Sequence, residues 1–263
     1  MTGDGIYEHE NSMQMNELAN AVAAKQPAYG TRLNLGMILA APNTVAEADV
    51  SAMLPDGVSL HTTRLALRGT DEAQLREMVA NTEAAAALLA YAGVDMIVFH
   101  CTAVTTMDPE MGTRIAERIH TATGIRATAT SEGLIAATTE LGVKRVVMLT
   151  PYTQSVNDSE VAFFSHYGVQ VVHESGFVPG KGEGSPSASP EQWFERTMAL
   201  QRDDTDAYLL CCTNIRAIPV IRVLEQALQK PVITSNQTMV WHCLRKAGIT
   251  DAVPGYGTLL AAH

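Results

Sequence analysis

Two stretches of the sequence share one pattern: VDMIVFHCTA at residues 94–103 and TDAYLLCCTN at residues 205–214. Each is an apolar run that ends in a Cys-Thr pair, Cys101-Thr102 in the first and Cys212-Thr213 in the second. A short, continuous apolar run ahead of a helical pattern is typical of a strand that a parallel sheet buries on both faces. The repeat therefore predicts two similar α/β units, each with a cysteine just beyond the carboxyl end of a strand.

The surrounding sequence extends this alternation of strands and helices, which is typical of βα units around parallel sheets. The expected strands span residues 33–39, 59–65, 96–99, 145–150, 169–174, 207–210 and 232–234. The expected helices span residues 71–91, 108–123, 131–141, 154–167, 190–201 and 215–228. Residues 1–30 and the Gly-, Ser- and Pro-rich stretch 178–190 lie outside this rhythm, and each is either a plain surface segment or a lid or contact arm.

Length and composition limit the classes of function. With 263 residues and 46% hydrophobic content, the chain is long enough for one large domain or two smaller ones. The formal charge of −10 and the lack of Lys/Arg clusters argue against a nucleic-acid partner. No apolar run reaches the roughly 20 residues that cross a bilayer. The acidic, polar N-terminus is unlike a signal peptide, so we expect no membrane partner and a cytoplasmic location.

The cysteine pattern predicts free thiols. The four cysteines, Cys101, Cys211, Cys212 and Cys243, have neither the spacing of a disulfide framework nor that of a zinc site, so we expect no metal. Cys101 and Cys212 would each lie at the carboxyl end of a strand and the start of a helix, where ligands bind and where the helix N-terminus favours the thiolate.

The residues next to these two cysteines are expected to have other roles. Because side chains alternate along a strand, His100 and Cys211 should point away from the face that Cys101 and Cys212 use. We expect Cys211 to be buried core, and His100 to be either a packed neutral imidazole or a group that orients a neighbour. Cys243, in an apparent late helix, is most simply core.

A lone cysteine after an apolar strand is more often a small buried hydrophobe than a nucleophile. Two cysteines in matching contexts favour chemistry, because a pair of thiols can exchange the roles of acid, base and nucleophile without a cofactor. A binding or regulatory protein that kept the fold and lost turnover is the alternative from a different class.

Neutral polar residues gather at the other expected strand ends. Asn43 and Thr44 follow the first strand, Tyr152 follows the fourth, Ser131 precedes a helix and Asn236 follows the last strand. Such groups are hydrogen-bond partners for carboxylates. The alternative for Asn43, Ser131 and Asn236 is that they only cap helices, and the two roles can coincide.

These motifs, taken in order, resemble the aspartate/glutamate racemase superfamily, and within it the branch of maleate cis-trans isomerases and arylmalonate decarboxylases. The motifs are Pro42-Asn43-Thr44-Val45-Ala46-Glu47, Ala52-Met53-Leu54, His61-Thr62-Thr63-Arg64, Cys101, Thr130-Ser131, Thr150-Pro151-Tyr152, Cys212 and Val253-Pro254-Gly255-Tyr256-Gly257. Asn43, Glu47 and residues 61–64 favour the maleate isomerases. Arylmalonate decarboxylases have a glycine where this chain has Cys101, which argues against decarboxylation.

The resemblance implies two pseudo-symmetric subdomains, each a four-stranded parallel sheet flanked by helices, with the active site at their interface. The first subdomain would comprise residues 31–127 plus 237–263 and the second residues 128–236, with residues 1–30 as an N-terminal extension. It also implies a homo-oligomer, a dimer or a tetramer.

The implied activity is cis-trans isomerisation of a maleate-like small-molecule dicarboxylate or its amide. Cys101 would add to the alkene and Cys212 would protonate and deprotonate the neighbouring carbon. The implied substrate-binding residues are Asn43, Thr44, Thr102, Ala103, Ser131, Tyr152, Thr213 and Asn214. The Cys-Thr pairs also resemble those of amino-acid racemases, so a two-cysteine racemase or epimerase of an amino acid, hydantoin or related acid remains an alternative. A decarboxylase of a malonate-type acid is a further one.

Overall fold

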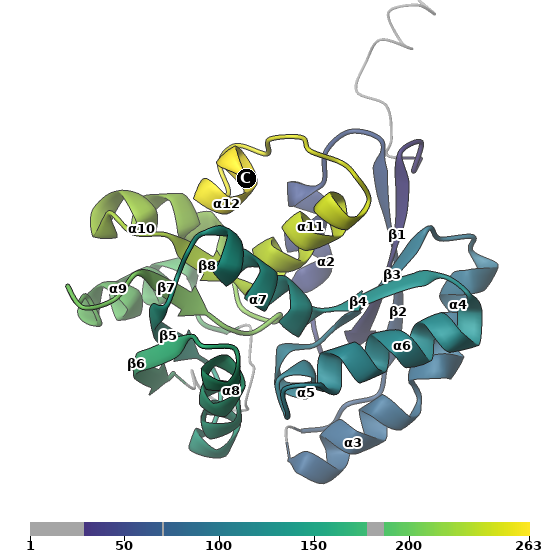
Figure 1. Cartoon of the computed structure of the whole chain (residues 1–263), viewed down its shortest axis with the longest axis horizontal. Coiled ribbons are helices and arrows are strands. Elements are labelled where there is room, and N and C mark those ends of the chain that lie inside the picture. The colour runs from purple at the N-terminus through teal and green to yellow at the C-terminus, as the bar shows by residue number, and fades with distance from the viewer. Residues whose placement is uncertain (1–28, 70, 178–186) are drawn as a thin grey trace, which may run out of the picture.

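Two parallel sheets with the same strand order organise the chain in a computed structural model, which describes residues 29–69, 71–177 and 187–263 (Figure 1). The first sheet has the order β2-β1-β3-β4 and the second β6-β5-β7-β8. The predicted α/β class and its two four-stranded sheets are confirmed. The expectations for an N-terminal extension up to residue 28 and for a loop at residues 178–186 lie outside the described residues.

The strands of the first sheet are β1 (Leu33–Ala40), β2 (Val58–Leu65), β3 (Met96–His100) and β4 (Arg126–Ala129). Those of the second are β5 (Arg145–Thr150), β6 (Gln170–Gly176), β7 (Ala207–Leu210) and β8 (Val232–Thr234). Both β3 and β7 are buried along their whole length, as their apolar sequences predict. They occupy equivalent positions in the two sheets, so the internal repeat of the sequence is a repeat of the fold.

The helices of the first half are α2 (Ala46–Met53), α3 (Glu72–Ala80), α4 (Thr82–Tyr91), α5 (Thr102–Thr105) and α6 (Met111–Thr123). They are followed by α7 (Thr130–Glu140), α8 (Gln154–His166), α9 (Pro190–Ala199), η1 (Ile218–Val220), α10 (Ile221–Leu228), α11 (Ser235–Lys246) and α12 (Thr258–Ala262). No helix of the described residues is long and apolar enough to cross a membrane.

Helices α2, α5, α11 and α12 lie outside the expected helix ranges, and the structure departs from the expected elements in three further places. Strand β4, with the sequence RATA and an exposed Arg126, has no apolar run that could reveal it, and it lies across the boundary expected after residue 127. The helix expected at residues 71–91 is interrupted at Asn81, whose backbone N–H bonds to Met78 and Val79. The helix expected at residues 215–228 begins as the 3-10 turn η1, which contains Pro219.

Helices α7 and α11 pack against each other between the two sheets (Figure 1). Gly133 on α7 allows this close approach, because a Cβ at that position would lie 3.1 Å from the carbonyl oxygen of Thr238 and 3.4 Å from Cβ of His242. Helix α11 also contacts α2 of the first half, so the α7–α11 pair links both sheets to one core.

Replacing Gly133 by valine is therefore expected to lower the free energy of unfolding by about 1–3 kcal/mol, because the added carbons force the two helices apart. Urea unfolding of Gly133→Val measures this. The matched control is Ala122→Val at an exposed position of α6, for which a change within about 0.5 kcal/mol is expected. Equal effects of the two substitutions would contradict the close-packing argument.

Candidate active site

The strand order itself selects the place for a site. In each sheet the two central strands connect to edge strands on opposite sides of the sheet. Ligands of open α/β sheets bind outside the carboxyl ends of such a central pair. In the first sheet these ends lead to Asn43, after β1, and Cys101, after β3. In the second they lead to Tyr152, after β5, and Cys212, after β7. Each half therefore supplies one neutral polar residue and one thiol.

Hydrogen bonds join the loop after β1 to the loop after β7, although these segments are 170 residues apart. The amide Nδ2 of Asn43 donates to Thr213 Oγ1 at 2.9 Å, and the backbone N–H of Thr44 donates to Asn214 Oδ1 at 3.0 Å. Asn43 Oδ1 also accepts from the backbone N–H groups of Val45 and Ala46. Asn43 thus closes the turn into α2 and contacts the second cysteine motif at once.

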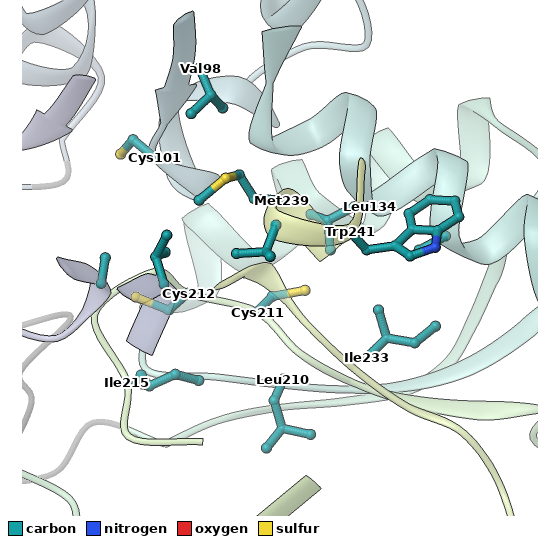
Figure 2. Close-up of a cluster of buried hydrophobic side chains, with 14 of the residues drawn as sticks. Val98, Cys101, Leu134, Leu210, Cys211, Cys212, Ile215, Ile233, Met239 and Trp241 are labelled. Carbon is teal, nitrogen blue, oxygen red and sulfur yellow. The ribbon is translucent and has the colours of Figure 1, made fainter. Parts of the chain in front are cut away.

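The side chains of the two motif cysteines point to the same side, whereas Cys211 points the other way, toward the core (Figure 2). All four cysteines are free and buried. Cys101 and Cys212 are also close enough to interact, because each thiol raises the pKa of Tyr152 and Cys101 raises that of Cys212. Cys243 packs in the core, with its Sγ 3.8 Å from Sδ of Met239.

Burial raises the pKa of Cys101 to about 11 and that of Cys212 to about 12. The hydrogen bond from Tyr152 and the backbone N–H of Asn214, 3.3 Å from Cys212 Sγ, lower the second value in part, and the backbone N–H of Val104 lowers the first. The expected effect of a helix N-terminus on the two thiols is outweighed by burial, and Cys212 is not followed directly by a helix, because the next helical turn begins at Ile218. Helix α5 is only four residues long, so its dipole does not offset the loss of solvation around Cys101.

A chain of hydrogen bonds through Asn236 connects the two cysteine motifs. Asn236, at the start of α11, donates from Nδ2 to Asp49 Oδ2 at 2.9 Å and to the carbonyl oxygen of Thr213 at 3.3 Å. Its Oδ1 lies 3.0 Å from Nε2 of His100. Because the amide uses its N–H groups on the other two partners, His100 must carry its proton on Nε2.

The opposite nitrogen of His100, Nδ1, lies 3.0 Å from Oγ1 of Thr130. Burial lowers the pKa of His100 to about 4, so the ring is neutral at neutral pH. His100 therefore fits both of its sequence interpretations: it is a packed neutral imidazole, and it orients Asn236.

The remaining predicted site residues lie in different settings. Thr102 turns its hydroxyl to Ser235 Oγ on α11, at 2.8 Å, and Ala103 lines a groove between the halves. Ser131 packs against the first turn of α6, where a Cβ on Gly112 would meet its Oγ. Neither Asp49 nor the buried Glu160 was predicted, although Glu160 shares a helical face with apolar residues, which is the signal for a buried acid.

Among residues 29–69, 71–177 and 187–263, no group of three or more His, Cys, Asp or Glu side chains is arranged to hold a metal ion. The groups that act on the two thiols are the hydroxyl of Tyr152, the backbone N–H groups of Val104 and Asn214, and the acid Glu160. Such a site can hold an anion by hydrogen bonds and present it to two thiols.

A model of the arylmalonate decarboxylase family matches residues 35–260. The chain belongs to this family. The resemblance inferred from the motifs is thereby confirmed. The maleate isomerase of Geobacillus stearothermophilus is 23% identical to this family member over 243 residues, which cover 86% of this chain and 96% of that protein.

Solved structures share the fold. The crystal structure of the maleate isomerase Iso from Pseudomonas putida S16 matches with a TM-score of 0.83 at 23% identity, and the match covers 88% of this chain and 98% of that one. A cysteine-to-serine variant of the Nocardia farcinica maleate cis-trans isomerase, with a covalently bound succinylcysteine intermediate, matches with a TM-score of 0.82 at 20% identity. That match covers 88% of this chain and 99% of the Nocardia chain.

Replacing Tyr152 by phenylalanine is expected to raise the pKa of Cys212, because it removes a hydrogen bond that lowers that pKa. Alkylation of Cys212 by iodoacetamide at a fixed alkaline pH should slow several-fold, measured for each cysteine by peptide mass spectrometry. Tyr208→Phe is the matched control, because the hydroxyl of Tyr208 instead accepts from the backbone of Arg202. An unchanged rate at Cys212 in Tyr152→Phe would exclude this hydrogen bond.

A second prediction concerns Asp49, whose pKa burial raises from 3.8 to about 6, with the hydrogen bond from Asn236 opposing the rise. Between pH 4 and 6 the unfolded state ionises first, so this residue's contribution to stability falls as the pH rises through that window. Asp49→Asn keeps an acceptor for Asn236 without this loss.

In urea unfolding, the stability of Asp49→Asn relative to the unmodified chain should be near zero at pH 4. It should grow on the order of 2 kcal/mol above pH 6. Asp158→Asn, at an exposed position of α8, is the control. A difference that does not vary with pH would rule out the raised pKa of Asp49.

Proposed function

We propose that the chain is a cofactor-independent cis-trans isomerase of a maleate-like unsaturated dicarboxylate. The observation that carries this proposal is the pair of buried thiols at equivalent strand ends of two similar sheets. The family membership and the maleate isomerases among the relatives support it. The succinylcysteine of the Nocardia enzyme is the adduct expected when a thiolate adds to maleate, which supports covalent chemistry at a cysteine here.

In the proposed reaction the thiolate of Cys101 adds to one alkene carbon. The Sγ–C bond forms, and the π electron pair moves to the neighbouring carbon, where the attached carboxylate delocalises it. The thiol of Cys212 gives a proton to that carbon and later takes it back. Rotation about the new single bond precedes elimination, which restores the double bond in the trans geometry and releases the thiolate of Cys101.

Neutral donors would hold the two carboxylates. Tyr152 is buried beside Cys212, and the backbone N–H groups that follow each cysteine lie at the carboxyl ends of β3 and β7. Because burial raises the pKa of Cys101 to about 11, the thiolate is the minor form at neutral pH. The turnover number should therefore rise as the pH increases toward that value.

Racemisation at a carbon next to a carbonyl is a second candidate, because two thiols presented from opposite halves suit proton transfer on both faces of one carbon. The two reactions leave different traces in deuterated buffer. A racemase incorporates deuterium at the α-carbon of a chiral acid, whereas the isomerase converts an alkene and needs no such hydrogen.

Proton NMR of the protein with maleate in deuterated buffer, without added metal or cofactor, tests the proposal directly. Growth of the fumarate alkene signal is expected. If maleate is unchanged while a chiral amino acid or hydantoin takes up deuterium, the racemase replaces the isomerase.

Alanine substitutions of the four cysteines provide matched pairs in the same assay. Cys101→Ala should abolish turnover, and Cys212→Ala should lower it by roughly 10²–10⁴-fold, the usual contribution of a positioned proton donor. Cys211→Ala and Cys243→Ala remove thiols that face the core, so both should stay folded and active. Full activity in Cys212→Ala would contradict the two-thiol mechanism.

A further inference from the structure

Glu160 is a fully buried acid for which the proposed reaction has no role. It lies on α8, and its exposed fraction is 0%. Neither carboxyl oxygen has a hydrogen-bond partner among the described residues. Leaving a buried polar group unpaired is costly in a folded protein, so an acid in this position calls for a partner that the chain itself does not provide.

The surroundings of Glu160 are the site itself. It acts on the pKa of Cys101, Cys212, Cys211 and Tyr152, and it raises all four. The hydroxyl of Thr106 faces Glu160 and lowers its pKa in part, but it donates its only proton to the carbonyl oxygen of Thr102, at 2.9 Å. Thr106 therefore has no proton left to stabilise a carboxylate at position 160.

The segment of α8 that carries Glu160 lies beside a groove. A cavity of about 430 Å³ lies between α3, the segment after α5, and α8. Its lining includes Ala103, two positions after Cys101, and Ser159, the neighbour of Glu160 on α8. The groove thus comes within two residues of Cys101 on one wall and within one residue of Glu160 on the other.

The charges around the site determine which protonation state of Glu160 could bind a dicarboxylate. No Lys, Arg or His of the described residues contributes to the pKa of Cys101, Cys212, Tyr152 or Glu160. Arg64, beside the first motif, bonds to Glu47 and to the carbonyl oxygens of Ala41 and Asn43. A carboxylate at position 160 would repel a doubly charged substrate in this dry site, whereas a carboxylic acid donates a hydrogen bond to it.

We propose that Glu160, as a neutral carboxylic acid, donates a hydrogen bond to one carboxylate of the substrate and so selects dicarboxylates over monocarboxylates. This inference rests on the proposed function and names a specificity-determining residue for it. Burial raises the pKa of Glu160 well above its usual value, so the acid keeps its proton at neutral pH.

Binding without turnover tests the proposal. Maleate and the monocarboxylate crotonate are titrated calorimetrically into the full chain carrying Cys101→Ala, alone and combined with Glu160→Leu, Glu160→Gln or the exposed control Asp158→Asn. Glu160→Leu should weaken maleate binding roughly 10- to 100-fold, the effect of losing a hydrogen bond to a charged group, and crotonate binding much less. Asp158→Asn should leave both affinities unchanged.

Glu160→Gln keeps a donor but cannot ionise, which separates a role in binding from a role in folding. Its maleate affinity at neutral pH should stay close to that of the Cys101→Ala parent. As the pH is raised through the pKa of Glu160, the parent should lose affinity by up to roughly tenfold per pH unit, and Glu160→Gln should lose much less. The remaining thiols and Tyr152 are present in both proteins, so the difference between them isolates Glu160.

Two outcomes would overturn the inference, and they differ in whether the proposed isomerase function also fails. If the parent binds maleate, but Glu160→Leu keeps its preference over crotonate and Glu160→Gln has the same pH dependence, Glu160 is only structural and the isomerase proposal stands. If the parent binds no dicarboxylate, the proposed function fails and the role of Glu160 fails with it. Should Glu160→Leu not fold, the pH comparison with Glu160→Gln decides alone.

Discussion

The side chain of Asn236 is the interaction on which the arrangement of the site depends. One amide bonds to Asp49 on α2, to His100 before the first catalytic candidate, and to the carbonyl oxygen of Thr213 after the second. Its two ends are chemically different, and the contacts with His100 and Thr213 are buried, so turning the amide over would place a carbonyl oxygen against Thr213 O. The amide can satisfy its three partners in only one orientation, so these bonds fix the separation of the two cysteine motifs on the side of α11. The bonds of Asn43 and Thr44 to the second motif fix the separation on the side of the loop after β1.

The sequence was sufficient to predict an element wherever a continuous apolar run or a regular alternation of side chains identifies it. The runs at β3 and β7 are apolar throughout, and the structure buries every residue in them, so their place in the sheet and the cysteines at their ends followed directly. Strand β4 could not be predicted in this way, because Arg126 is exposed and the strand is defined by its pairing with β3. The alternation of side chains correctly separated Cys211 from Cys212. The pKa of the thiols could not be read from position, because it depends on burial by elements distant in sequence.

The residues that could not be predicted from the sequence are those whose role depends on partners far away in the sequence. Asp49 looks like an ordinary acid in the first turn of α2, and its partner Asn236 is 187 residues away. Glu160 lies in a helix with mixed polar residues, and only its spacing from Val156, Phe163 and Phe164 places it on the buried face. Helical spacing reports burial, and burial of an acid without a basic partner is a reason to look for function. The spacing does not report which groups face the acid, and that is a property of the assembled halves.

The repeat supplies two equivalent thiols, and the departures from symmetry give them different surroundings. Where the first half has Asn43, the second has Tyr152, so only Cys212 receives a hydrogen bond from a phenol, together with the backbone N–H of Asn214. Cys101 accepts from one backbone N–H. Bond formation to carbon reduces the capacity of a sulfur to accept hydrogen bonds. The thiol with fewer donors therefore loses less on becoming a thioether, and the thiol with more donors is better held for giving and regaining a proton. This asymmetry favours Cys101 as the group that bonds to the substrate and Cys212 as the acid and base, independently of any relative.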